Sequence, residues 1–392
     1  MIERDAARPL RELARHYPVV TVTGPRQAGK TTLCRHVFTD KPYVSLEALD
    51  IRAGAAADPR GFLAEYGAGA VIDEVQHVPG LLSYLQVEVD ERPEPGRFIL
   101  TGSQHFGLAD SIAQSLAGRT GILHLLPPSL DELQRFPHPP RDLLSTLWMG
   151  AYPRIHDRRI PADRWLADYV ATYVQRDVRQ VLNVGDLESF STFLRLAAGR
   201  TAQEVNLSAL GADAGVTHNT ARAWLSVLEA SFLCVRIPAW HRNVRKQAVK
   251  APKLHLLDSG LVCNLLGIRE PEQLRHHPLR GAIFESWVVA EIYKARLHRG
   301  RDARISHYRD AKRLEVDVLV ERSDCVALVE AKSGATVTGD MFRSLHALAD
   351  ALRAGGEHRR LDRRLVYGGA TRHRREGIAV TPWNDIQTLD WS

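Results

Sequence analysis

The chain has 392 residues, more than one hydrophobic core usually organises, so we expect several domains. Hydrophobic residues make up 44% of the chain and charged residues 25%, and no stretch approaches the roughly 18 consecutive apolar residues that cross a bilayer. We therefore predict no membrane segment. The formal charge of +6 favours a nucleic-acid partner, because clustered cations attract phosphate.

The cysteines and the start of the chain indicate a cytoplasmic protein. The first residues lack the basic flank and the apolar run of a secretory signal. The four cysteines are far apart and show no C-x-x-C spacing, which argues against a zinc site or a disulfide framework. They are Cys34, Cys234, Cys263 and Cys325. We expect buried free thiols in the cytoplasm.

The first third of the chain alternates short apolar runs with helical patterns, which predicts an α/β domain with a parallel sheet over residues 1–135. The five expected strands are Pro18–Thr23, Pro42–Leu46, Ala70–Asp73, Arg97–Thr101 and Gly121–Leu125.

A phosphate-binding motif follows the first expected strand and precedes a helical pattern. It fits G-x-x-x-x-G-K-[ST] in full, and its residues are Gly24, Pro25, Arg26, Gln27, Ala28, Gly29, Lys30 and Thr31, followed by Thr32. In such a loop the backbone amides surround the phosphates and the lysine reaches the β- and γ-phosphates. The hydroxyl of Thr31 is expected to help hold Mg²⁺. The sequence therefore predicts a P-loop site for ATP and Mg²⁺.

Two further strands are expected to bring polar residues to the same edge of the sheet. Asp73 ends the third strand and would hold Mg²⁺ through water, and the next residue, Glu74, would polarise the attacking water. The fourth strand leads into Thr101, Ser103 and Gln104, which are candidates to contact the γ-phosphate or the water.

One arginine is a candidate to stabilise charge on the leaving phosphate. Arg119 stands just before the fifth expected strand, where an arginine finger or sensor role and an ordinary surface position both remain open. A finger role needs a neighbouring copy of the chain unless Arg119 acts within its own subunit.

These motifs together resemble a known family. Four segments are similar to bacterial and archaeal AAA-type ATPases whose C-terminal half is a domain of unknown function, namely Gly24–Thr31, Asp73–Gln76, Thr101–Gln104 and Ser115–Arg119. The resemblance covers most of the chain. It implies an ATPase at the front, a winged-helix-like module in the middle and a restriction-endonuclease-like fold at the back.

The middle of the chain is expected to hold a helical lid or connector over residues 136–200 and a winged-helix-like domain over 201–270. Two helical patterns around Gly215 form a helix-turn-helix, with its core at Leu207, Leu210, Ala214, Val216, Ala221, Leu225 and Leu228. Candidates for DNA contact are His218, Asn219, Thr220 and Arg222 on the second helix and Arg242, Arg245, Lys246, Lys250 and Lys253 in the wing. A structural or protein-contact role remains the alternative.

The last segment, residues 271–392, carries acids in an order that resembles PD-(D/E)xK nucleases. Glu285, Asp317 and Glu330 are candidate Mg²⁺ ligands, and Lys332 projects from the same strand face as Glu330. Only eight of the 52 lysines and arginines are lysines, so Lys332 is informative. No Pro-Asp pair is present, which departs from the nuclease pattern.

Two functions therefore compete. One is an ATP-driven enzyme that acts on DNA and cleaves it with a Mg²⁺-dependent nuclease-like domain. The other is an ATP-dependent switch that binds DNA or a protein partner and cleaves nothing. Assembly into a homo-oligomer remains open in both.

Overall fold

The computed structural model describes residues 2–103, 114–174, 187–241 and 251–391. The chain forms two compact units. The first comprises Met1–Pro128 with the short segments Ala230–Phe232 and Arg296–Arg301, and the second comprises the rest. No helix among the described residues is long and apolar enough to cross a membrane.

The first unit is built on a five-stranded parallel sheet. Its strands are β1 (Val19–Gly24), β2 (Tyr43–Ser45), β3 (Ala70–Asp73), β4 (Phe98–Ser103) and β5 (Thr120–His124). They lie in the order β2-β3-β4-β1-β5, so β4 separates the strand that precedes the phosphate-binding motif from the strand that ends at Asp73. The predicted parallel sheet with five strands is confirmed.

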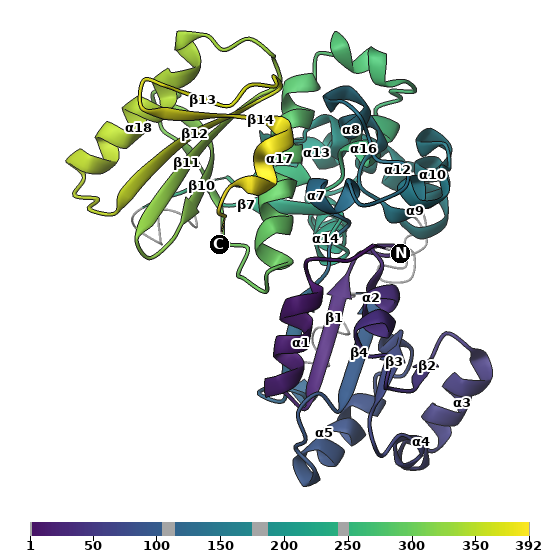
Figure 1. The fold of residues 1–392 in the computed structure, drawn as a ribbon. Coiled ribbons are helices and arrows are strands. Elements are labelled where there is room, and N and C mark those ends of the chain that lie inside the picture. Colours follow the sequence, from purple (N-terminus) through teal and green to yellow (C-terminus); the bar gives the residue numbers. More distant parts are fainter. Residues whose placement is uncertain (1, 104–113, 175–186, 242–250, 392) are drawn as a thin grey trace. The chain divides into compact units, whose positions relative to one another are not determined.

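Helices cover both faces of this sheet (Figure 1). Successive side chains of a strand point to opposite faces, and here both faces are apolar. Val20 and Val22 pack with α1 (Ala7–His16) and α2 (Lys30–Val37). Val19 packs on the other side with the helices α3 (Leu49–Ala57), α4 (Pro59–Glu65) and α5 (Leu81–Glu91). The P-loop NTPase type of α/β fold therefore rests on two separate cores.

The second unit begins with helices that share one core with the segments after them. These helices are α7 (Leu130–Leu133), α8 (Leu143–Met149), α9 (Pro153–Arg158), α10 (Ala162–Tyr169), η2 (Val170–Val174), α12 (Leu187–Gly199) and α16 (Ser259–Leu265). Asp258 joins distant parts of this core, because its carboxylate accepts hydrogen bonds from the backbone N–H of Leu261 at 2.8 Å and of Ala151 at 2.8 Å. The expected lid segment is thus part of a larger compact body.

The expected helix-turn-helix lies within this unit. It consists of α13 (Leu207–Asp213) and α14 (His218–Ala230), and one strand before them and two after them form a small sheet with the order β6-β8-β7. The strands are β6 (Gln203–Glu204), β7 (Cys234–Ile237) and β8 (Lys253–Leu256). Thr217 caps α14, because its hydroxyl accepts the N–H of Thr220 at 3.1 Å. Leu210, Ala221, Leu225 and Leu228 are buried as expected.

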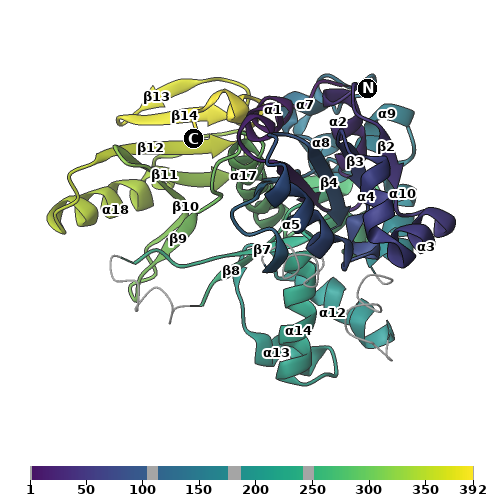
Figure 2. The same ribbon diagram turned by 90° about the horizontal axis from the view of Figure 1, so that it is seen from below.

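The C-terminal part of the second unit is a six-stranded sheet with a helix on each face (Figure 2). Its order is β13-β14-β12-β11-β10-β9, with β9, β10 and β11 antiparallel and β11, β12 and β14 parallel. The strands are β9 (Ser306–Arg309), β10 (Glu315–Glu321), β11 (Cys325–Lys332), β12 (Arg360–Tyr367), β13 (His373–Arg375) and β14 (Ile378–Pro382). The helices are α17 (Arg280–Leu297) and α18 (Arg343–Ala354).

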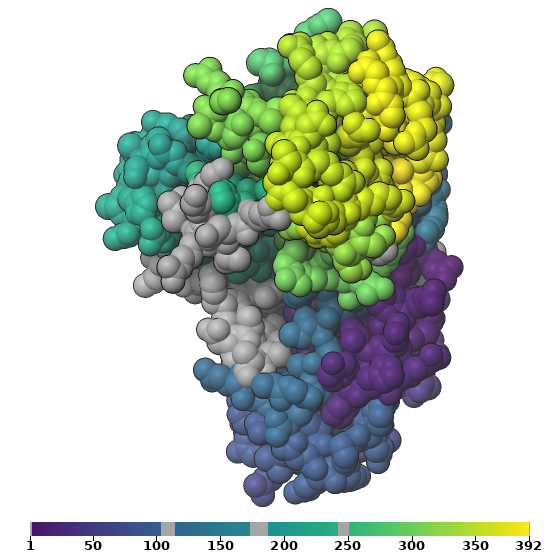
Figure 3. Space-filling view, turned by 90° about the vertical axis from the view of Figure 1, so that its left-hand side faces the viewer, coloured from purple at the N-terminus to yellow at the C-terminus, as the bar shows by residue number. Residues whose placement is uncertain are grey.

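The expected strands at β10 and β11 are present, whereas β9 escaped the sequence analysis because its residues, Ser306–Arg309, are mostly polar and give no apolar run. In the space-filling view the C-terminal residues, coloured lime to yellow, form one continuous surface (Figure 3).

Candidate functional site

The loop between β1 and α2 has the backbone shape that encloses phosphate. Gly24 has a φ of 151°, and a Cβ on it would lie 2.0 Å from the carbonyl oxygen of Leu125, so only glycine fits there. Gly29 has a φ of 96° and Gln27 a φ of 63°, which turn the loop into the start of α2. The residues between them, Pro25, Arg26 and Ala28, continue this loop, and Thr32 lies exposed on α2.

Lys30 lies buried beneath this loop. Its ammonium group donates hydrogen bonds to the carbonyl oxygens of Gly24 at 3.0 Å and Pro25 at 2.9 Å. Burial lowers the pKa of Lys30 to about 8, and the nearby carboxylate of Glu74 opposes that shift only in part. Among the described residues its hydrogen bonds go to neutral carbonyl oxygens, whereas a triphosphate would supply anionic ones.

The carboxylate of Asp73 accepts hydrogen bonds from three hydroxyl groups at the carboxyl edge of the sheet. The Thr31 hydroxyl donates to Oδ1 at 2.9 Å, the Tyr43 hydroxyl donates to Oδ2 at 2.8 Å, and the Thr101 hydroxyl also donates to Oδ1. Thr31 and Asp73, the two residues expected to hold Mg²⁺, are thus adjacent although 42 positions separate them. A hydroxyl and a carboxylate are oxygen ligands of the kind that Mg²⁺ prefers, so this pair fits the ion.

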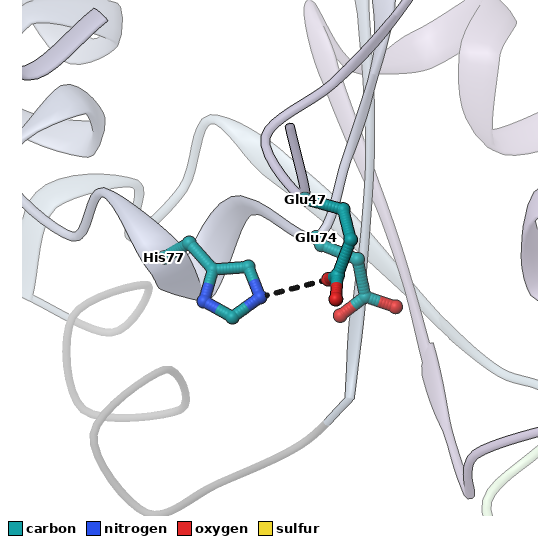
Figure 4. Close-up of side chains that lie close together, drawn as sticks. All are labelled: Glu47, Glu74 and His77. Atoms are coloured by element: carbon teal, nitrogen blue, oxygen red, sulfur yellow. Dashed lines mark hydrogen bonds and ion pairs between the residues drawn. The ribbon is translucent and has the colours of Figure 1, made fainter. Parts of the chain in front are cut away.

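Glu74 follows directly and turns the chain out of β3 with a left-handed φ of 56°. The side-chain amide of Gln76 donates to its carboxylate. Figure 4 shows this carboxylate beside the ion pair between Nε2 of His77 and Oε2 of Glu47, which are 3.1 Å apart. A ligand atom from each of Glu47, Glu74 and His77 lies within 4.8 Å of the others.

Other residues predicted for this edge differ in how far the structure describes them. Ser103 ends β4, and its backbone is paired in register with Gly24. Gln104 lies outside the described residues. Arg4, which the sequence analysis missed, donates hydrogen bonds to the carbonyl oxygens of Ala28 at 2.9 Å and Leu126 at 2.8 Å and so braces the loop. No sequence pattern distinguishes Arg4 from the many other arginines.

Arg119 lies at the opposite end of the sheet. Its carbonyl oxygen accepts the N–H of Val19, the first residue of β1, whereas the loop follows the last residue of β1. Five residues of strand separate the two levels by roughly 17 Å. The Arg119 side chain forms an ion pair with Asp90, with Nη2 donating to Oδ2 at 2.8 Å. The structure therefore does not place Arg119 beside the nucleotide loop of its own subunit.

The candidates for DNA contact on α14 lie at its first turns. Asn219 and Arg222 are exposed, and His218 and Thr220 are partly exposed. Of the residues expected in a wing, Arg242, Arg245, Lys246 and Lys250 lie outside the described residues. Lys253 was expected to meet phosphate, and this prediction is wrong because its side chain is only 3% exposed.

The four C-terminal candidates come together in the second unit. Lys332 donates to Oε1 of Glu330 at 2.5 Å, and one oxygen of Asp317 accepts the backbone N–H of Ala331 at 2.9 Å. Burial, with the nearby Asp317 charge, raises the pKa of Glu330. Oε2 of Glu330 is buried and has no hydrogen-bond partner among the described residues.

An ammonium group stands where these acids were expected to hold Mg²⁺. Nζ of Lys253 lies 2.8 Å from Oε1 of Glu285 and 3.8 Å from Oδ1 of Asp317, and it also pairs with Glu315. Burial raises the pKa of Glu285, and the three carboxylates outweigh burial and raise the pKa of Lys253. With Lys253 there, the set does not fit a divalent cation. The rarity of lysine in this chain was the one signal that could have drawn attention to Lys253.

Comparison with known proteins divides the chain into three matched segments. Residues 16–134 match the family described as AAA domain. Residues 140–272 and 280–386 match two families described as domains of unknown function, DUF8612 and DUF4143.

Two mycobacterial proteins are similar over most of the chain. The uncharacterized protein Rv2008c of Mycobacterium tuberculosis is 30% identical over 367 residues, which cover 91% of this chain and 80% of that protein. The uncharacterized protein Mb2031c of Mycobacterium bovis gives the same values. Among solved structures, the Walker-type ATPase PABY2304 of Pyrococcus abyssi is 16% identical, covering 68% of this chain and 96% of its own, with a TM-score of 0.45.

Proposed function

Because the chain belongs to the same family as the uncharacterized protein Rv2008c of Mycobacterium tuberculosis and its residues 16–134 match an AAA domain, we propose that its first unit binds ATP and hydrolyses it with Mg²⁺. The observation that carries this proposal is the buried Lys30 ammonium group under the loop, with Thr31 and Asp73 in contact beside it.

Lys30 and the loop amides bind and orient the triphosphate. Lys30 exchanges its hydrogen bonds to the carbonyl oxygens of Gly24 and Pro25 for bonds to the β- and γ-phosphate oxygens. The charge-assisted bonds gained are stronger than the neutral ones lost. Thr31 would hold Mg²⁺ directly and Asp73 through water. Mg²⁺, when bound, neutralises charge on the β- and γ-phosphates.

Glu74 is the candidate that directs water. Its position after Asp73 puts a carboxylate at the same edge of the sheet, where it accepts a proton from water as the oxygen attacks the γ-phosphorus. The bond from that phosphorus to the β,γ-bridging oxygen breaks as the new bond forms, and ADP leaves. Gln76 holds the Glu74 carboxylate and fixes its orientation.

Two substitutions separate binding from hydrolysis. Lys30→Ala is expected to abolish ATP turnover and to weaken nucleotide binding strongly, because the phosphate-binding cation is lost. Glu74→Gln is expected to lower turnover by a factor of about 10² to 10⁴ and to keep binding, because only proton acceptance is lost. Turnover is followed by phosphate release and binding by a fluorescent ATP analogue. Unchanged turnover in Lys30→Ala would remove the assignment.

The second unit favours the switch over the nuclease. Lys253 stands among Glu285, Glu315 and Asp317, so we derive no cleavage step through a metal there. We propose instead that ATP controls how this unit engages DNA or a protein partner. Exposure of Asn219 and Arg222 at the start of α14 supports DNA as the partner.

DNA engagement is tested with one matched pair of variants. Arg222→Ala is expected to weaken binding to a labelled duplex by about 1–3 kcal/mol, because it removes a cation where a helix of this kind meets the groove. Arg269→Ala removes one exposed arginine elsewhere in the second unit and should leave affinity almost unchanged. Anisotropy titrations at two salt concentrations measure both. Equal losses in the two variants would indicate nonspecific attraction, and no binding by the wild type would favour a protein partner.

A further inference from the structure

A buried lysine stands inside the C-terminal group of acids. Lys253 is the first residue of β8, and its ammonium group contacts three carboxylates from two other elements. Glu285 comes from α17, and Glu315 and Asp317 come from β10. Two of these partners are themselves well buried, Glu285 with 15% and Asp317 with 8% of the side chain exposed.

This placement leaves the acids without room for a second cation. An oxygen-bound divalent ion needs carboxylate oxygens at about 2.0–2.6 Å. Oε1 of Glu285 already lies 2.8 Å from Nζ of Lys253, and Oδ1 of Asp317 lies 3.8 Å from the same atom. An ion on those two oxygens would stand next to the ammonium group, and two like charges in a buried place repel strongly. The two cations therefore compete for one position.

The other oxygens of the group offer no second position of equal quality. The second oxygen of Asp317 accepts the N–H of Ala331, and Oε1 of Glu330 pairs with Lys332. Oε2 of Glu330 is buried and has no hydrogen-bond partner among the described residues, but a single oxygen is an incomplete set of ligands. Oε2 of Glu315 lies 4.0 Å from Nε of Arg309 and so stands beside another cation. We propose that the Lys253 ammonium group holds the place of a divalent cation among Glu285, Glu315 and Asp317, so that this site takes a metal ion only when Lys253 is absent.

Lys253 and the acids for which it competes with a metal ion lie on different parts of the second unit. β8 pairs with β7 and β6, so the strand that carries Lys253 belongs to the small sheet beside α13 and α14. The acids belong to α17 and to the six-stranded sheet. The internal cation is thus supplied by one module to the acids of another within the same compact unit, and the inference does not depend on the ATP site.

The test compares thermal unfolding of the full chain, free of nucleotide, with and without Mn²⁺. In the wild type, Mn²⁺ should have the same effect on the unfolding temperature as in the Asp317→Asn variant, because no ion binds at this group of acids. Lys253→Met keeps the length of the side chain and removes its charge, so it should unfold at a lower temperature, and Mn²⁺ should raise that temperature by roughly 5 °C. Lys253→Arg keeps a cation and should gain no response to Mn²⁺.

The double variant Lys253→Met, Asp317→Asn identifies the site of the response. It should lose the rise with Mn²⁺, because a ligand of the ion is gone. Calorimetric titration with Mn²⁺ should give one more ion bound in Lys253→Met than in the wild type.

Two results would overturn the proposal. One is an ion bound by the wild type in a way that Asp317→Asn abolishes. The other is a Lys253→Met variant that stays unfolded, or folds without any response, at saturating Mn²⁺, because the proposal requires the ion to replace the ammonium group. ATP turnover, measured on the same samples, reports separately on the first unit.

Discussion

At the scale of single residues, the main feature of the candidate nucleotide site is a lysine whose charged form is destabilised by burial. Lys30 is buried, and its hydrogen bonds go to two neutral carbonyl oxygens, so burial lowers the pKa of its ammonium group to about 8. Asp73 is in the opposite situation, since three hydroxyl groups donate to it. The cation is thus held ready for an anionic ligand, while the carboxylate is already oriented.

ATP affinity should therefore depend on pH in a way that reports on Lys30. A bound triphosphate favours the charged lysine and raises its pKa, so binding above pH 8 requires uptake of a proton. The affinity is expected to stay level below pH about 8 and to fall by up to tenfold for each further pH unit, until the pKa of the bound state is reached. Titration with a fluorescent nucleotide between pH 7 and 9.5 measures this.

Lys30→Met is the control for that profile. It should bind nucleotide weakly with no slope in the same range, because the titrating group is gone. A wild-type affinity that stays level to pH 9.5 would show that Lys30 is fully charged before ATP arrives.

At the scale of elements, the parallel direction of the strands determines which residues lie near the phosphate-binding loop. β1 runs parallel to β4 and β5, so the loop after β1 and the ends of its neighbours lie at one level, and Arg119 at the start of β5 lies at the other. The close approach of Gly24 to Leu125 joins the loop to the end of β5. Loop shape and sheet packing are therefore one structural feature.

Gly24→Ala tests this feature. Its Cβ would lie 2.0 Å from a carbonyl oxygen, so we expect a loss of about 1–3 kcal/mol in the free energy of unfolding together with weaker ATP binding. Gly54→Ala is the matched control in the same unit, because the added Cβ meets no atom within 4 Å and lies inside α3. That variant should be neutral or more stable by about 0.5–1 kcal/mol. Denaturant unfolding compares them, and equal effects would refute the packing argument.

At the scale of the whole molecule, two compact units with separate cores share one chain. The helical segment after Pro128, the helix-turn-helix and the helix α17 contribute to a single core. The domain boundaries expected at residues 136, 201 and 271 all lie within this second unit and stay predictions.

Separate cores predict separate unfolding transitions. An ATP analogue with Mg²⁺ should raise only the transition of the first unit, by an amount that corresponds to about 2.7 kcal/mol at 100 times the dissociation constant. Asp258→Ala should lower only the other transition, because it leaves the N–H groups of Ala151 and Leu261 without their acceptor. Calorimetry with and without nucleotide measures both. A single transition that shifts in both experiments would contradict independent cores.

The sequence by itself determined the phosphate-binding motif and the parallel sheet. The phosphate-binding motif is contiguous, its glycines and lysine act through local backbone geometry, and alternation of apolar runs with helical patterns is enough to indicate strands and their covering helices. Local chemistry of this kind is readable without coordinates.

Only the tertiary structure decided which charges meet. The sequence does not distinguish Arg4, Tyr43 and Arg119 from the many other polar residues of the chain. The fold places Arg4 and Tyr43 at the edge of the sheet that carries the phosphate-binding loop, and Arg119 at the opposite end. Lys253 and Glu285 are 32 positions apart, and their contact exists because β8 and α17 pack together. Long-range ion pairs depend on how elements pack, and that information is spread over the whole core.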